Sequence, residues 1–401
     1  MRESASHTRT DPSDVRIAEV LGARSGLERH RAAGLFVPPA YGGACISEVV
    51  PTIMRRLERG ATRPSWLAPE VLDAAQVVLL VLDGLGFEQL RARLDAAPVL
   101  ASMQGGPITS VAPTTTATAL SSIATGLTPA EHGVIGYRFR VGDDEVLNVL
   151  RWSTASGDAR TRVPPASIQT RAPFLGRGVT AVSRTEFCGS GFTEAHLGGV
   201  RLAGWRVASS MPVEIAQLLR AGETFVYAYY DGIDKVAHER GLGAHYLAEL
   251  RATDRLVGDL LGVLPPGAAL VVTADHGQVE VLDAPIVLGE EILRGVRLQS
   301  GEGRFRWLHV EAGALDDVLA GCAATLGDVA VVASRDELVD SGLFGGPLAP
   351  PVAARLGDVA LVATAPVAFF DPTDTGEMTL VARHGAMTSA EVFVPLLSAS
   401  A

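Results

Sequence analysis

The sequence predicts an α/β protein, built on a largely parallel central sheet that is covered by helices. Two continuous apolar and β-branched runs, 76–82 and 268–273, have the composition of strands that are buried on both faces. Segments with helical spacing lie between the candidate strands, and this alternation is typical of parallel sheets. With 401 residues and 47% hydrophobic residues, the chain is long enough to bury a sizeable core.

The remaining elements follow in chain order from hydrophobic spacing and from Pro and Gly breaks. Residues 1–15 are polar and charged and are expected to be mobile. Residues 36–43 carry two prolines and two glycines, which interrupt regular structure. Helical patterns are expected at 16–34, 47–57, 87–94, 212–219 and 247–261, and further strands at 108–112, 178–182, 224–230 and 359–363.

The domain organisation predicted from these elements is one domain over residues 16–401. Its core spans about 70–280 and 355–401. Between them, residues 281–354 contain Gly and Pro interruptions and only short candidate strands, at 304–310 and 329–333. We interpret this segment as a smaller cap or flank inserted into the core.

Composition excludes several classes of protein. The formal net charge of −11 lacks the basic footprint of a nucleic-acid or anionic-membrane binder. The three cysteines are far apart and odd in number, as expected for reduced thiols. The N-terminus has no apolar signal region, and the longest apolar run, 359–370, is too short to span a membrane. We therefore expect a soluble, cytoplasmic protein without a membrane or nucleic-acid polymer as partner.

A threonine-rich stretch, 111–126, contains five threonines and two serines in sixteen residues. Its first two residues end the candidate strand 108–112, and the residues after Pro113 have helical composition. Thr and Ser hydroxyls at a helix start can cap the backbone N–H groups, in a position that also attracts anions. The stretch therefore predicts either a purely structural helix cap or an anion site with a nucleophilic hydroxyl.

Acidic and imidazole side chains follow directly after several candidate strands. In open α/β sheets, ligands bind beyond the carboxyl ends of the strands, so these side chains are expected at one edge. Singly, each can be a turn residue, a surface helix pair or an ordinary loop histidine. Together, three carboxylates and three imidazoles suit two zinc ions or, less specifically, manganese. The six residues are Asp83, Asp234, His238, Asp275, His276 and His384.

The ordered set of motifs resembles the alkaline phosphatase superfamily and, within it, the type I phosphodiesterase/nucleotide pyrophosphatase family. The similarity is to the shorter bacterial members and runs from about residue 76 to the C-terminus. It implies an alkaline-phosphatase-like three-layer sandwich with a smaller inserted cap. The motifs are Leu82-Asp83-Gly84, 113–116 with 125–133, 234–241, 273–277 and His384-Gly385.

The resemblance also implies roles for the candidate residues. The family pattern makes Thr116 the nucleophile, bridging the two ions, with Thr115 as the alternative. Asp231 is the alternative to Asp234, and His132 lies in a family motif but not at a ligand position. One ion would be bound by Asp234, His238 and His384, and the other by Asp83, Asp275 and His276.

Two departures from the family pattern concern nucleotide recognition. Ala119 stands where members acting on nucleotides often carry an Asn that binds the phosphoryl oxygen. Ala117 replaces the aromatic residue that often stacks on a base. Hydroxyls of Thr114, Thr115 or Thr118 are candidate replacements for the missing donor. All six predicted metal ligands are present, so the two departures bear on which substrate is recognised more than on the metal-dependent reaction.

The sequence thus predicts a metal-dependent hydrolase of phosphodiester or phosphoanhydride bonds in a small nucleotide-like substrate, acting through a phospho-threonine intermediate. A phosphomonoesterase or phosphonate hydrolase of the same superfamily is the alternative; a sulfatase would need Cys or Ser at the nucleophile position. A dinucleotide-binding protein built on Asp83-Gly84-Leu85-Gly86 is disfavoured, because the third glycine and the later acidic residue are missing.

Overall fold

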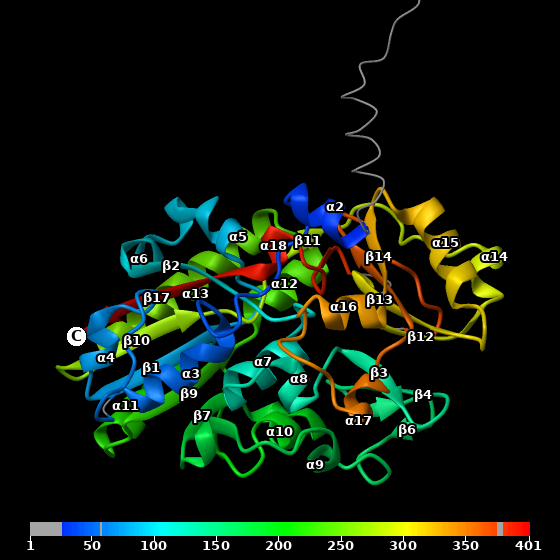
Figure 1. Cartoon of the computed structure of the whole chain (residues 1–401). Coiled ribbons are helices and arrows are strands. Elements are labelled where there is room, and N and C mark those ends of the chain that lie inside the picture. The colour runs from blue at the N-terminus through cyan, green and yellow to red at the C-terminus, as the bar shows by residue number, and fades with distance from the viewer. Residues whose placement is uncertain (1–25, 57, 375–379) are drawn as a thin grey trace, which may run out of the picture.

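The structure is a computed structural model that describes residues 26–56, 58–374 and 380–401. A seven-stranded sheet forms its centre, in the order β2-β17-β10-β1-β9-β7-β8 (Figure 1). The strands are β1 (Gln76–Leu82), β2 (Gln104–Thr109), β7 (Thr180–Arg184), β8 (Arg201–Trp205), β9 (Phe225–Tyr230), β10 (Ala268–Thr273) and β17 (Phe393–Ser400).

The centre of this sheet is parallel, as the sequence predicts. β1 pairs in parallel with both β9 and β10, and every residue of β1 after Gln76 is buried. β17 is the exception, because it runs antiparallel to both of its neighbours, β10 and β2. The carboxyl ends of β1, β9 and β10 therefore meet at one edge of the sheet.

Helices cover both faces of the central sheet (Figure 1). α6 packs against α13, and α3 packs against α7. Not one of the described helices combines the length and the apolar character needed to cross a bilayer. The helices bordering the sheet are α3 (Ile46–Arg55), α4 (Pro69–Asp73), α5 (Phe87–Arg91), α6 (Pro98–Ser102), α7 (Thr116–Thr125), α8 (Pro129–His132), α9 (Pro165–Ile168), α10 (Gly191–His196), α11 (Met211–Arg220), α12 (Gly232–Arg240), α13 (Ala244–Gly262) and α18 (Ser389–Val392).

A second, antiparallel sheet lies beside the first and has its own apolar core (Figure 1). Its strand order is β12-β13-β15-β14, that is, Val296–Glu302, Phe305–Val310, Val359–Ala363 and Ala330–Ser334. Five of the described helices belong to this part of the molecule: α2 (Gly26–Ala32), α14 (Glu290–Leu293), α15 (Leu315–Leu326), α16 (Arg335–Asp340) and α17 (Pro350–Ala353).

The strand Val359–Ala363 corrects one expectation. The sequence predicts its bounds but places it in the core segment 355–401, whereas it pairs with β13 and β14 of the second sheet. Both sheets bury such a strand on both faces, so its apolar composition fits either position. Its partners are distant in sequence and leave no local signal.

Two small sheets complete the described structure. One has the order β3-β4-β5-β6 and falls within residues 138–158, where the sequence predicts no strand. Its strands are β3 (Arg138–Val141), β4 (Glu145–Asn148), β5 (Ser153–Thr154) and β6 (Gly157–Asp158). The other pairs β11 (Val279–Glu280) with β16 (Ala382–Arg383), next to the site described below.

Other expected elements are present with shifted ends. The strand expected at 108–112 is β2, which spans Gln104–Thr109 and so begins and ends earlier than expected. The strand expected at 178–182 is β7, two residues later. Of the helix expected at 16–34, the structure describes only Gly26–Ala32; residues 16–25 and the segment 1–15 lie outside the described residues.

Candidate active site

The candidate site lies at the edge where β1, β9 and β10 end. Asp83 follows β1, and Asp275 and His276 follow β10. α12, which carries Asp234 and His238, begins shortly after β9. Gly84 allows the end of β1 to lie close to Asp234 and Gln278. Its φ is +72°, and a Cβ there would lie 2.7 Å from the Gln278 amide nitrogen and 3.0 Å from Asp234.

The first group of potential metal ligands comprises Asp83, Asp275 and His276. All three are buried, and one ligand atom of each lies within 4.8 Å of the others. Asp275 Oδ1 accepts hydrogen bonds from the backbone N–H groups of Gly84 (3.1 Å) and His276 (3.0 Å). Asp83 Oδ2 accepts a hydrogen bond from the Tyr229 hydroxyl. Each carboxylate is thus oriented through one oxygen.

The second group comprises Asp234, His238 and His384. One ligand atom of each again lies within 4.8 Å of the others. Asp234 and His238 lie one helical turn apart on α12, and Asp234 Oδ2 is 3.2 Å from His238 Nε2. Gln278 donates to the other oxygen of Asp234. His384 follows β16 and reaches the site from the distant C-terminal part of the chain.

The three histidines share one hydrogen-bonding pattern. His276 Nδ1 is 3.1 Å from the Gly277 carbonyl oxygen, His238 Nδ1 is 2.7 Å from that of Ala382, and His384 Nδ1 is 2.9 Å from that of Thr114. A carbonyl oxygen only accepts, so Nδ1 carries the proton in each ring. The lone pair of each Nε2 is therefore available to a metal ion, as in metal-binding histidines whose other ring nitrogen donates to a carbonyl oxygen.

The two groups adjoin each other, since the rings of His276 and His384 stack with centroids 3.6 Å apart. Burial raises the pKa of Asp83 well above its usual range, and the negative charges of Asp275 and Asp234 raise it further. Burial also opposes ionisation of Asp234, but His238, together with His384 and His276, outweighs burial and holds the pKa of Asp234 below its usual value. Burial and His276 hold the pKa of His384 well below its usual value.

These residues fit a pair of divalent cations. Asp83 Oδ1 and Asp275 Oδ2 are buried and have no hydrogen-bond partner among the described residues. Unpaired buried carboxylate oxygens are costly, and a divalent cation would offset that cost. The combination of imidazole nitrogens and carboxylate oxygens suits zinc, with manganese as the second choice.

Thr116 lies beside both groups. It is the first residue of α7, it is 7% exposed, and its Oγ1 is 3.1 Å from His276 Nε2. The preceding Thr115 is the N-cap residue, but its side chain makes no capping hydrogen bond. The Thr115 hydroxyl therefore does not cap α7, although the sequence allows that role.

Thr114 has a structural role instead. Its hydroxyl donates to the Ala386 carbonyl oxygen (2.7 Å) and accepts from the Gly385 N–H (3.1 Å). Its backbone carbonyl accepts from His384 Nδ1. Thr114 thereby fastens the segment that carries His384 to the start of α7, and its hydroxyl is already used as a donor.

The alternative residues lie outside both groups. Asp231 forms ion pairs with Arg184 (2.6 Å) and Lys235 (2.5 Å). His132 accepts from the Val134 N–H at Nδ1, so its Nε2 donates to Ser122 (2.8 Å). Burial, with the nearby Arg355, lowers the pKa of His132 to about 3, so this imidazole is neutral.

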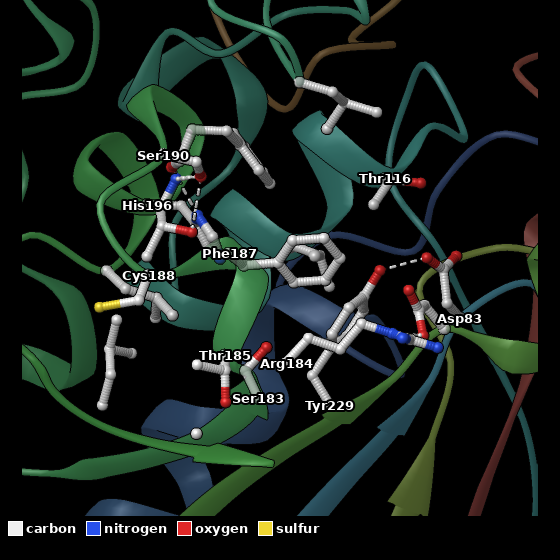
Figure 2. Close-up of a pocket in the computed structure, with 18 of the residues that line it drawn as sticks. Asp83, Thr116, Ser183, Arg184, Thr185, Phe187, Cys188, Ser190, His196 and Tyr229 are labelled. Atoms are coloured by element: carbon white, nitrogen blue, oxygen red, sulfur yellow. Dashed lines mark hydrogen bonds and ion pairs between the residues drawn. The ribbon is translucent and has the colours of Figure 1, made fainter. Parts of the chain in front are cut away.

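Two cavities meet at the Thr116 hydroxyl. The larger, of about 440 Å³, extends over the ends of β7, β8 and β9 (Figure 2). The smaller, of about 200 Å³, is lined by Arg151 and Arg383 together with His238 and His384. Thr116, Leu150 and Asp234 line both cavities.

Sequence reasoning does not identify the residues that orient the ligands. Tyr229 lies inside a buried apolar strand, and its hydroxyl is one of several in the run 224–230. Gln278 follows the Asp275–Gly277 motif by one position, which is the one signal that could have identified it. Arg184 and Phe187, which line the larger cavity, carry no motif.

A family model described as type I phosphodiesterase/nucleotide pyrophosphatase matches residues 77–387. Murine ectonucleotide pyrophosphatase/phosphodiesterase 5 is similar in structure, with TM-score 0.59, 14% identity, and coverage of 80% of this chain and 87% of that chain. A structure of an inactive variant of the murine protein was solved in complex with AMP.

Phosphonoacetate hydrolase from Sinorhizobium meliloti 1021, in complex with phosphonoformate, is also similar. Its TM-score is 0.60 at 20% identity, with 84% of this chain and 92% of that chain covered. No curated protein sequence shows a significant match. The structural neighbours confirm the alkaline-phosphatase-like fold, and the match of the family model over most of the chain shows that the protein belongs to the type I phosphodiesterase/nucleotide pyrophosphatase family of hydrolases.

Proposed function

We propose that the protein is a metal-dependent hydrolase that cleaves phosphodiester or phosphoanhydride bonds in a small phosphorylated substrate through a phospho-threonine intermediate on Thr116. One observation carries the proposal. The Thr116 hydroxyl, 3.1 Å from His276 Nε2, lies beside two adjoining groups that each offer two kinds of metal ligand. Two zinc or manganese ions bound there would lower the pKa of a coordinated hydroxyl and offset charge on the phosphoryl oxygens.

The side chains of this chain supply binding and orientation. Asp234, His238 and His384 would hold one ion, and Asp83, Asp275 and His276 would hold the other. Thr116 lies in the first turn of α7, where backbone N–H groups without helical partners and the helix dipole favour an anionic phosphoryl group.

The reaction then proceeds in two displacements. Thr116 Oγ1 forms a bond to phosphorus while the bond to the leaving oxygen breaks, and the leaving alcohol or phosphate takes up a proton. Water then cleaves the phospho-threonine bond, which releases the phosphorylated product and restores the hydroxyl.

A substrate with two substituents on phosphorus is favoured by the two cavities that meet at Thr116. A phosphomonoester has one substituent and would leave one cavity without an occupant. A phosphonate hydrolase is the second candidate, because the similar structures include phosphonoacetate hydrolase and because Ala119 stands in place of the family's nucleotide-associated Asn.

The test compares substrates and nucleophile variants of zinc-loaded protein. We expect bis-p-nitrophenyl phosphate to be hydrolysed with a higher kcat/KM than p-nitrophenyl phosphate. Thr116→Ala should lower kcat at least about a thousandfold, as for other nucleophiles, while zinc content stays the same. Thr115→Ala should retain most of the activity.

The outcomes separate the candidates. Activity that survives Thr116→Ala but not Thr115→Ala would reassign the nucleophile. A preference for the monoester would refute the diesterase, and hydrolysis of phosphonoacetate alone would establish the phosphonate hydrolase instead.

A further inference from the structure

The larger cavity beside Thr116 has a distinct chemical character. Its walls come from β7, β8, β9, α10 and the residues that follow β7 (Figure 2). Apolar side chains make up much of this wall, among them Leu120, Phe187, Phe192, Leu197 and Leu202. We call this cavity the chamber.

Most polar side chains of the chamber wall are already hydrogen-bonded within the protein. The Ser190 hydroxyl bonds with Thr193 (3.0 Å), and His196 Nδ1 bonds with the Phe192 carbonyl oxygen (2.7 Å). The Thr185 hydroxyl donates to the Trp205 carbonyl oxygen (3.3 Å). Burial lowers the pKa of His196 to about 4, so this imidazole is uncharged. The donors of Ser190, Thr185 and His196 Nδ1 are thus already used within the protein.

Apart from the candidate metal ligands, the charged side chains of the chamber are also paired. Asp231 lies between Arg184 and Lys235 and forms an ion pair with each. Arg184 further stacks over the Trp205 ring, with 4.8 Å to its centroid, and Lys235 lies 5.8 Å from the centroid of Phe187. The two cations are thus partly neutralised, which disfavours a second phosphate or carboxylate as the occupant.

Two aromatic rings point into the space next to the reacting hydroxyl. Figure 2 shows the Phe187 ring between Tyr229 on one side and His196 with Ser190 on the other. The rings of Phe187 and Tyr229 have centroids 6.2 Å apart. Tyr227, which also lines the chamber, has a buried hydroxyl without a hydrogen-bond partner among the described residues. An apolar group with a single acceptor atom matches this lining.

We infer that the chamber binds an apolar ester arm, aryl or branched alkyl, that stays on the phosphorus attacked by Thr116 while the other substituent leaves. This rests on the proposed function and narrows its substrate class. A nucleoside arm fits less well, because its ribose hydroxyls and base edge would lose water in a wall that is largely apolar and whose donors are mostly used.

The experiment uses three diesters that release the same leaving group, p-nitrophenolate: the methyl, phenyl and thymidine 5′ esters of p-nitrophenyl phosphate. With zinc-loaded protein, we expect kcat/KM for the phenyl ester to exceed that for each of the other two at least about tenfold. A thymidine ester equal to or better than the phenyl ester overturns the inference, and so does a methyl ester equal to it.

A binding measurement keeps the inference testable if none of the diesters is cleaved, an outcome that would refute the proposed function. Calorimetry with zinc-loaded Thr116→Ala compares phenyl phosphate with methyl phosphate and thymidine 5′-phosphate. Tighter binding of phenyl phosphate supports the chamber's assignment, and equal or weaker binding refutes it.

A matched pair of variants locates the effect in the chamber. Leu202 lies on the edge strand β8 and is partly exposed, so a charge there is compatible with folding. Leu202→Glu should lower kcat/KM for the phenyl ester about tenfold and change the methyl ester less than twofold. Val207→Glu, a 62% exposed position outside the chamber wall, should change neither. Equal effects on both esters would refute the chamber's role.

Cys188 offers an independent test, because it lines the chamber and is exposed while Cys45 and Cys322 are buried. Alkylation of Cys188 with N-ethylmaleimide should abolish the preference for the phenyl ester and leave methyl ester hydrolysis intact. Cys188→Ser should be insensitive to the reagent. An unchanged preference after complete alkylation would contradict the inference.

Discussion

Each carboxylate of the candidate site uses one oxygen to fix its orientation and turns the other toward its neighbours. Tyr229, Gln278 and backbone N–H groups supply the fixing hydrogen bonds. Such partners of metal ligands commonly change metal affinity by one or two orders of magnitude. The site therefore extends beyond the residues that the motifs reveal.

Tyr229→Phe tests the importance of this support. The variant removes the hydroxyl that donates to Asp83 and keeps the ring, so we expect zinc affinity to fall about 10- to 100-fold. Tyr227→Phe is the matched control, since that hydroxyl has no hydrogen-bond partner among the described residues. Competition with a chromogenic chelator measures both; equal affinities in the two variants would show that Tyr229 does not orient Asp83.

His132 should make stability depend on pH. Its pKa is about 3 in the folded protein because of burial, against about 6.5 in an unfolded chain. Between these values the unfolded chain binds a proton that the folded chain does not. The free energy of unfolding therefore falls as the pH falls below 6.5, by up to about 1.4 kcal/mol per pH unit from this group.

Urea unfolding of the wild type and of His132→Gln at pH 7.5 and pH 5.0 isolates this contribution. His196 and His309, whose pKa values burial lowers to about 4, act in the same direction and remain in both proteins. We expect a smaller loss of stability at pH 5.0 in the variant. Identical losses would mean that His132 is not buried as a neutral imidazole.

At the scale of elements, the bounds of a strand are predicted best from the sequence where that strand is buried on both faces. The strands 76–82, 268–273 and 359–363 have the predicted bounds, because continuous β-branched runs leave few alternatives. β2 contains Gly105, Gly106 and Pro107, and β17 contains Pro395, so their patterns are obscured. β17 also pairs with strands far away in sequence, and no local pattern identifies such partners.

The junction between the two sheets depends on a buried ion pair. Arg304, in the turn between β12 and β13, binds Glu391 of α18 through two contacts of 2.7 and 2.8 Å. Both side chains are fully buried. This pair ties the second sheet to the segment that leads into β17.

Glu391→Gln should therefore destabilise the protein by about 3–5 kcal/mol, since it leaves the Arg304 charge buried without compensation. Asp144→Asn is the control, because its ion pair with Arg297 is exposed and should be worth less than about 1 kcal/mol. Urea denaturation followed by circular dichroism measures both. A loss below 1 kcal/mol for Glu391→Gln would show that the junction does not need the charge.

At the scale of the whole molecule, the site gathers residues from both halves of the chain. The predicted ligand residues are all brought together. Five of them follow a strand of the central sheet or lie on the helix after one, whereas His384 follows the short strand β16. His384 reaches the site through the hydrogen bonds of Thr114, which the sequence does not reveal. Motif order identifies such a residue only through the family resemblance.

Metal binding should stabilise the whole fold. A ligand that binds only the folded state adds about 2.7 kcal/mol at a hundred times its dissociation constant. We expect zinc to raise the thermal midpoint of chelator-treated protein and EDTA to reverse the shift. Asp275→Asn should reduce the shift strongly; a midpoint that does not respond to zinc in the wild type would refute the metal site.

The distance in sequence between the ligands has a consequence for folding. Asp83 and Asp275 lie on opposite sides of a long stretch of chain, and so do His238 and His384. Under the proposed two-ion arrangement, each ion acts as a cross-link that closes a large loop, whose entropic cost grows only slowly with its length. The cross-link through Asp83 and Asp275 needs β1 and β10 to be paired, and the one through His238 and His384 needs the segment around His384 to have docked onto α12. Uptake of metal would thus mark the completion of folding rather than its start.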